Sequence, residues 1–267
     1  MSKTIARTWC CRLTLMLVAL LSGCATTASR DPRDPLEPFN RSVSAFNSVL
    51  DTALIKPAAE AYVKVIPRPV RRGVNNFFGN LGDISVMFNN LLQGKVNNAA
   101  SDFGRLTMNS TFGLLGIFDV ATALGIPKHD EDFGQTLGKW GVGTGPYIVL
   151  PVFGPTTTRD ALASVPDAYL NPANYIDDEP TRWSLFGLGI VNTRANLLKA
   201  TNILDEAAID KYTFTRNALL QRRLKQVYDG EVPAQSLKDH LEDIDDPEPD
   251  APAAPAPADS APPAQPK

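Results

Sequence analysis

The sequence predicts a mainly α-helical protein with one glycine-rich, apolar hairpin. Apolar residues recur at helical spacing along most of the chain, and proline or aspartate residues mark the expected helix starts. The stretch 131–155 differs, because it places Gly138, Gly141, Gly143 and Gly145 between apolar ends. It holds too many glycines for a stable helix and too many apolar residues for a solvent loop. We therefore expect a hinged hairpin that faces something other than water.

The first 23 residues have the features of a lipoprotein signal peptide. Three basic residues precede the apolar run Leu13–Leu21, which is shorter than the about 20 residues that span a bilayer. The run ends in Leu-Ser-Gly-Cys, so we expect cleavage before Cys24 and lipidation of its thiol. A plain secretory signal with an incidental cysteine is the alternative. Residues 24–33 then form a tether too short to cross the periplasm, and Ala25 favours the outer membrane.

Helix signals divide the first half of the body. Asp34 is expected to cap the first helix with Pro35 at its first position, although Pro38 favours a start a few residues later. Pro57 and Pro69 each predict the start of another helix. The expected ranges are 34–50, 58–66, 70–78, 83–94 with Asp83 as cap and Gly94 as end, and 95–108.

The segment 112–126 is the most apolar part of the mature chain. It has 15 residues and contains Asp119, so we expect a buried or interfacial helix and not a membrane span. Asp119 either caps or hydrogen-bonds locally, or it lines a polar passage as an ionised carboxylate.

Beyond the hairpin, the pattern predicts a helix from Thr158 to Ala168, a polar turn region at 171–179, and helices over 181–200 and 205–228. The last helix has a basic face, which is either a solvated side or a contact for phospholipid headgroups. That face consists of Arg216, Arg222, Arg223 and Lys225. The tail 247–267 holds eight prolines and seven alanines in 21 residues, so we expect it to be extended and disordered.

No pattern for catalysis, a cofactor or a metal stands out. Cys24 is the only cysteine of the mature chain, and the two histidines, His129 and His240, are far apart; we expect His129 to lie in a solvated acidic loop. The chain lacks both G-x-S-x-G and a P-loop. Its charge is balanced outside the acidic C-terminal segment, which argues against nucleic acid. Of the 18 glycines, 14 lie between Gly73 and Gly154, which suits ordinary turns or helices that pack closely, bend or face lipid tails.

Four motifs, in this order behind the signal sequence, resemble those of the MlaA (VacJ) family of outer-membrane phospholipid-transport lipoproteins. The resemblance covers residues 34–246, and the tail departs from the family pattern. The stretches that carry it are DPLEPFNRSVSAFN at 34–47, NNFFGNL at 75–81, NNLLQG at 89–94, and DFGQTLGKWGVGTGPYIVLPVFGP at 132–155 with TTTRD after it.

The resemblance implies a ring of amphipathic helices lying flat in the periplasmic leaflet of the outer membrane, around a passage for phospholipid headgroups. It also implies that mislocalised phospholipids leave the outer leaflet and pass to a soluble periplasmic carrier, and that a trimeric porin holds the ring. It implies no cofactor.

Carried onto this sequence, the hairpin from Phe133 to about Thr158 resembles a mobile lid beside the passage, with Gly141 and Gly143 as pivots. Ala45, Phe46 and Asn47 of the first helix would lie near the passage and help to keep it closed. The lid residues that the resemblance implies are Phe133, Trp140, Tyr147, Ile148, Leu150 and Phe153. Two other classes of function stay open: a structural adaptor that braces a porin, and a lipid-degrading enzyme, which the missing nucleophile disfavours.

Overall fold

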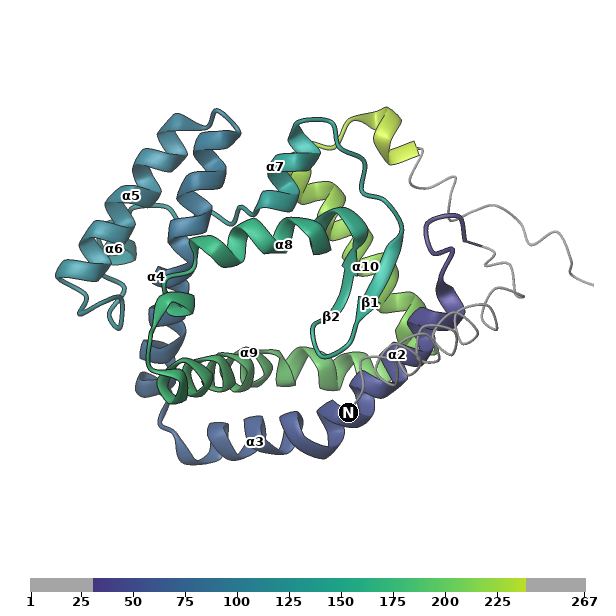
Figure 1. The fold of residues 1–267 in the computed structure, drawn as a ribbon, viewed down its shortest axis with the longest axis horizontal. Helices are drawn as coiled ribbons and strands as arrows, with labels where there is room; N and C mark the ends of the chain where they lie inside the picture. The colour runs from purple at the N-terminus through teal and green to yellow at the C-terminus, as the bar shows by residue number, and fades with distance from the viewer. Residues whose placement is uncertain (1–30, 239–267) are drawn as a thin grey trace, which may run out of the picture.

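A computed structural model of the chain describes residues 31–238, except the side chain of Ala207, and the fold is mainly helical (Figure 1). The signal peptide 1–23, Cys24 and the tail 247–267 lie outside these residues, so the predictions made for them stay predictions. The described elements are, in chain order, α2 (Glu37–Leu50), η1 (Asp51–Ile55), α3 (Lys56–Val65), α4 (Arg68–Leu92), α5 (Val96–Thr111), α6 (Val120–Ala123), α7 (Phe133–Lys139), β1 (Tyr147–Leu150), β2 (Gly154–Thr157), α8 (Thr158–Leu170), η2 (Pro172–Tyr175), α9 (Glu179–Ala207) and α10 (Lys211–Val227).

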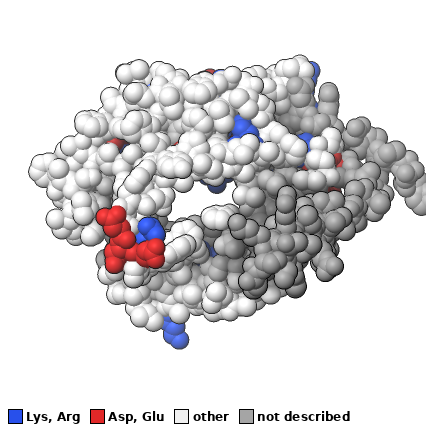
Figure 2. All heavy atoms as spheres, viewed as in Figure 1, with Lys and Arg blue, Asp and Glu red and all other residues white. Residues whose placement is uncertain are grey.

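The helices are arranged as a ring around a central opening, as Figure 1 shows. Contacts between distant segments close it: α3 packs against α9, α4 packs against α5 and α9, and α10 packs against α7. The space-filling view is hollowed at the same place, so side chains do not fill the opening on this face (Figure 2). The predicted mainly helical ring is thereby confirmed.

The first helix begins later than its capping signal predicted. Asp34 is fully buried and accepts hydrogen bonds from Asn40 and from the Tyr212 hydroxyl, so its carboxylate is not available to cap the helix. The helix begins at Glu37 and continues into α3, because a π-helical turn at Asp51–Ile55 leads directly into Pro57. A π-turn already interrupts the regular hydrogen-bond ladder, which accommodates the N–H that proline lacks.

The two helices expected over 70–78 and 83–94 are a single helix, α4. Asp83 does not cap a helix; it is buried in the helix interior, 3.1 Å from the Lys128 ammonium group. Desolvation raises the pKa of the Asp83 carboxyl, and the charge of Lys128 opposes that shift. Helix α5 lies close to its predicted range. His129 lies in a loop with exposed Lys128 and Asp130, as expected, but its own ring is half-buried and contacts the buried Asp102 carboxylate at 2.7 Å.

The apolar segment 112–126 forms tight turns and the short helix α6 in place of the predicted long helix. Leu114 and Leu115 have positive φ angles of 51° and 59°, and a Cβ at Gly113 would lie 2.2 Å from the Phe118 carbonyl oxygen. Asp119 caps α6 by accepting from the Thr122 N–H at 3.0 Å, which agrees with the local alternative for this residue.

The second half corrects three boundaries. Residues 133–139 form helix α7 inside the region predicted as hairpin, because Asp132 caps it and α8, α10 and α4 pack against it. Helix α9 extends to Ala207, beyond the predicted end at 200. The last helix begins at Lys211 and not at 205, because the Asp210 carboxylate caps it through the Tyr212 and Thr213 N–H groups.

Burial in the described residues is partly inverted relative to a water-soluble helical protein. Six of the largest fully buried side chains illustrate this, since all are polar or charged: Arg105, Gln135, Asn40, Asn89, Asn90 and Asp102. Large apolar side chains lie outside, with Phe112 at 71% and Phe153 at 75% exposure. Among the described residues, the face in Figure 2 accordingly shows few charged side chains. None of the described helices combines the length and apolarity that crossing a bilayer requires.

Candidate functional site: the hairpin and its seat on α2

The site is a two-stranded hairpin between α7 and α8. Strand β1 pairs antiparallel with β2, from Tyr147 opposite Thr157 to Leu150 opposite Gly154. The period of two along β1 buries Tyr147 and Val149, while Ile148 and Leu150 are half-buried. Phe153 projects from the turn at 75% exposure. The hairpin therefore has one face in the protein and an apolar tip outside it.

Two asparagines of α2 hold the outer edge of β1. Asn40 accepts from the Val149 N–H at 2.9 Å and donates to the Tyr147 carbonyl at 3.0 Å. Asn47 lies seven residues, or two helical turns, further on; it donates to the Leu150 carbonyl at 2.9 Å and accepts from the Val152 N–H at 2.8 Å. The two amides thus supply the pairing that a third strand would give, and α2 becomes the seat of the hairpin.

A buried polar cluster fixes the base of the hairpin. Asp34 accepts from Asn40 at 2.8 Å, from the Tyr212 hydroxyl at 2.5 Å and from Arg216 at 3.2 Å. The Tyr147 ring packs edge-on against Tyr212 at 6.0 Å, and its N–H donates to the Arg33 carbonyl at 2.8 Å. Burial raises the pKa values of both tyrosines, and Asp34 adds to the shift, through its charge at Tyr147 and through its hydrogen bond and then its charge at Tyr212.

The glycines around the hairpin differ in what their backbones require. Gly141 has φ +91°, in the region that favours glycine, whereas the φ of Gly143 is not positive and space is open beside both. Gly145 and Gly154 also have positive φ angles, of 67° and 85°. The backbone therefore favours glycine at Gly141 but not at Gly143, the role of both as pivots stays a prediction, and the sequence interpretation overlooked Gly154 at the start of β2.

The remaining predicted site residues lie in two groups. Phe133 and Trp140 pack edge-on across α7 at 6.1 Å, and the Trp140 indole donates to the Leu92 carbonyl at 3.2 Å. Ala45 and Phe46 lie exposed on α2 beside Asn47, with Phe46 at 55% exposure. The sequence interpretation missed Asn40 and Asp34. An asparagine seven residues before Asn47 in an otherwise apolar helical pattern was the available signal.

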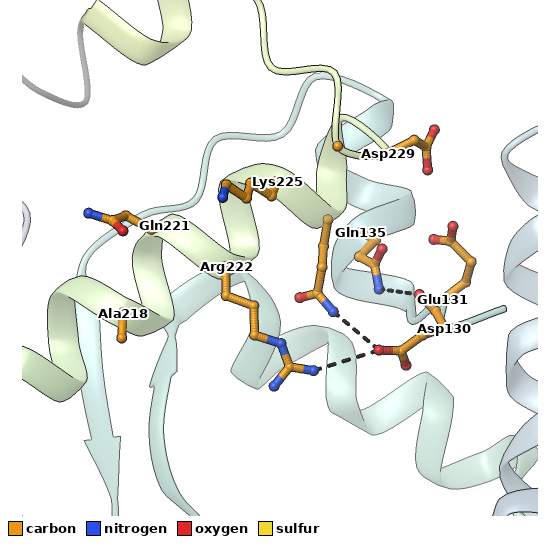
Figure 3. Close-up of a pocket in the computed structure, with 10 residues that line it drawn as sticks. Asp130, Glu131, Gln135, Ala218, Gln221, Arg222, Lys225 and Asp229 are labelled. Carbon is orange, nitrogen blue, oxygen red and sulfur yellow. Dashed lines mark hydrogen bonds and ion pairs between the residues drawn. The ribbon is translucent and has the colours of Figure 1, made fainter. Parts of the chain in front are cut away.

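The basic face expected on α10 is not a uniform solvated surface. Arg216 and Arg223 are mostly buried and pair with carboxylates, so neither alternative proposed for this face fits them. Arg222 and Lys225 instead line a polar groove of about 540 Å³ between α10 and the start of α7 (Figure 3). There the Arg222 guanidinium lies 3.6 Å from the Asp130 carboxylate. Within residues 31–238, no cluster of His, Cys, Asp and Glu side chains is arranged to bind a metal.

Comparisons with known proteins agree on one family. The family profile described as MlaA lipoprotein matches residues 32–226. The chain is 36% identical over 241 residues to the "Intermembrane phospholipid transport system lipoprotein MlaA" of Escherichia coli K12, covering 85% of this chain and 94% of that protein. It is 35% identical to the protein of the same name from Haemophilus influenzae, covering 87% of this chain and 98% of that one. A solved structure described as "Structural basis for maintenance of bacterial outer membrane lipid asymmetry" matches with a TM-score of 0.64 at 34% identity, over 73% of this chain and 98% of that chain.

Proposed function

The chain belongs to the MlaA lipoprotein family, and we propose that it transfers mislocalised phospholipids from the outer leaflet of the outer membrane towards the periplasm, so maintaining lipid asymmetry. The observation that carries the proposal is the inverted burial around an open ring. Polar side chains such as Asn89, Asn90 and Asp102 lie inside the described fold, and large apolar side chains lie outside it. A body of this kind is stable where its outer surface meets lipid tails, because its polar side chains pair with one another inside the fold and its apolar side chains face outwards.

The body rests in the membrane as a monotopic ring. The apolar turns at 112–118 expose Phe112, Leu114, Leu115 and Phe118, the groups that partition into acyl chains. The lipidated Cys24 and its tether of residues 24–33 hold the ring at the periplasmic leaflet, because so short a tether reaches no further. Phospholipid is the cargo, and the protein works by transfer without catalysis.

The hairpin acts as the lid of the passage, with Gly141 and Gly143 as pivots. Asn47 holds its tip against α2 through two hydrogen bonds, and this contact represents the closed position. Phe46 and Phe153 present apolar surface beside it. Breaking these two bonds, one part-buried and one exposed, costs roughly 1–3 kcal/mol, which is compatible with release of the tip during transport while Asn40 keeps the base of β1 on α2.

The partners follow from the same scheme. A trimeric outer-membrane porin holds the ring, and a soluble periplasmic carrier of the same pathway accepts the phospholipid. The exposed aromatic side chains of α9, Trp183 and Phe186, which pack edge-on at 5.8 Å, give the ring an amphipathic rim suited to a porin or to the membrane interface.

A disulfide lock tests the lid directly. Asn47→Cys with Val152→Cys joins two positions that hydrogen-bond in the structure, and the chain is expressed in cells that lack their own MlaA. Outer-leaflet phosphatidylethanolamine is measured with a membrane-impermeant amine reagent. We expect the reduced pair and each single cysteine variant to keep surface phospholipid low, and the oxidised pair to let it accumulate. Low surface phospholipid with the lock closed would refute the lid.

The second candidate function is a porin-bound adaptor that transfers no lipid. The exposed aromatic pair on α9 is the observation that favours it. An adaptor would retain the porin complex and show no difference in surface phospholipid between the oxidised and reduced lock.

A further inference from the structure

Two carboxylates flank the hinged segment in sequence and meet in space. Asp132 lies directly before α7, and Asp160 lies in the first turn of α8, so the hinge glycines and both strands lie between them. Both contact the same guanidinium, that of Arg223 on α10. Its Nη1 and Nη2 atoms lie 2.6 and 2.9 Å from the two oxygens of Asp132. Its Nε atom lies 2.8 Å from Asp160 Oδ2, as an ion pair whose N–H is not directed at that oxygen.

The contact is partly enclosed and balanced in charge, since the Asp132 side chain is 39% exposed and its partners are mostly buried. The side chains of Arg223 and Asp160 are each 11% exposed, and Arg159, at 4%, adds a second cation that donates to Asp160 at 2.9 Å. Arg159 also reaches the hinge, since its Nη1 atom lies 3.4 Å from the Val142 carbonyl. Two arginines and two aspartates thus form a neutral cluster at the base of the hairpin.

The packing around this cluster explains a glycine that a helix would otherwise disfavour. A Cβ at Gly134 of α7 would lie 2.4 Å from Asp160 Oδ1 and 2.6 Å from Arg223 Nη2. A Cβ at Gly138, one turn on, would lie 2.8 Å from Arg159 Nη1. Helix α7 is therefore seated directly on the arginines, which makes the cluster a built feature of the fold.

We propose that Arg223 is a positioning residue for the hairpin, holding together the two ends of the hinged segment so that motion is confined to the part between them. This rests on the lid proposed above. With Asp132 and Asp160 joined, α7 and the start of α8 form a fixed base, and the glycines move the strands relative to it. Without Arg223, α7 and the start of α8 are no longer held together, and Asp160 keeps only Arg159 as a cationic partner. The hairpin is then no longer held in a fixed position on α2.

Hydrogen exchange of the full-length chain in detergent tests the proposal without reference to transport. Arg223→Met keeps the length of the side chain and removes its charge and donors. We expect amides of residues 147–157 to exchange about tenfold faster or more, because breaking a buried pair leaves an uncompensated charge. Arg223→Lys, which keeps the charge but not the two-pronged geometry, should give an intermediate rate. The matched control is Arg194→Met, since Arg194 makes an equally close pair with Asp51, at 2.7 Å, between α9 and η1. It should leave the hairpin unchanged.

Two results would overturn the proposal. The first is an unchanged exchange rate in the hairpin of Arg223→Met. The second is faster exchange in α3 and α9 as well as in the hairpin, to the same extent, in both Arg223 variants, because Arg223 would then contribute only to general stability. The same variants are then assayed for surface phospholipid. Faster hairpin exchange with normal transport supports the positioning role of Arg223 and counts against the lid. Abnormal transport with faster hairpin exchange supports both.

Discussion

Asn40→Ala should be the most destabilising single truncation at the seat of the hairpin. The side chain is fully buried and makes three hydrogen bonds, to Asp34 at 2.8 Å, to the Tyr147 carbonyl at 3.0 Å and from the Val149 N–H at 2.9 Å. Leaving buried partners unsatisfied costs about 1–3 kcal/mol each, and some relaxation is expected, so we predict a loss of about 3–5 kcal/mol in the free energy of unfolding.

Two asparagines provide matched controls. Asn47 makes one part-buried and one exposed bond, so Asn47→Ala should cost about 1–2 kcal/mol. Asn76 donates one exposed bond to the Ile117 carbonyl, and its truncation should cost less than about 1 kcal/mol. Asn40→Asp should be at least as harmful as Asn40→Ala, because it turns an oxygen towards Asp34.

The assay is denaturant unfolding of the full chain in detergent, followed by tryptophan fluorescence. Equal losses for Asn40→Ala and Asn47→Ala would refute the reasoning, since burial and bond number would then not decide the cost.

Two further predictions concern glycines and tyrosines. Gly104→Ala should raise the unfolding free energy by about 1 kcal/mol, because the position is helical and nothing lies within 4 Å of the new Cβ. Gly134→Ala should lower the unfolding free energy, because its Cβ would meet Asp160 and Arg223. The denaturant midpoints of the two variants check these opposite signs. Burial and the Asp34 charge raise the pKa of Tyr212 above its ordinary value of 10.0, so the folded state holds this proton longer than the unfolded state. The resulting stability is complete below about pH 10 and is lost as pH rises further, and Tyr212→Phe should flatten that decline; an equally steep decline in the variant would contradict the assignment.

Much of the fold was predictable because helical periodicity and capping are local. Helix α5 begins within its predicted range and ends three residues beyond it, and the hairpin strands lie within their predicted region. The helix starts were harder to predict, since Asp83 and Asp34 carry the same capping signal as Asp119 and Asp132, which do cap helices. What separates these carboxylates is tertiary: Lys128 and Tyr212, distant in sequence, bury the first two. A capping motif alone does not reveal such partners.

The site was predictable in outline only. Glycines between apolar ends marked the hairpin, whereas its seat depends on side-chain amides that pair with backbone more than 100 residues away. Arg216 and Arg223 were misassigned for the same reason, because a basic helix face looks alike in sequence whether its partners are solvent or buried aspartates.

Photocrosslinking to phospholipid tests the central claim most directly. In full-length protein within cells, a photoreactive amino acid replaces either Phe153 at the hairpin tip or Arg222 in the polar groove. Both positions are exposed, since Phe153 is 75% exposed and the Arg222 side chain is 68% exposed. The account predicts phospholipid adducts at position 153 and none at 222. Adducts of equal yield at both positions, or none at 153, would contradict a lipid passage beside the hairpin.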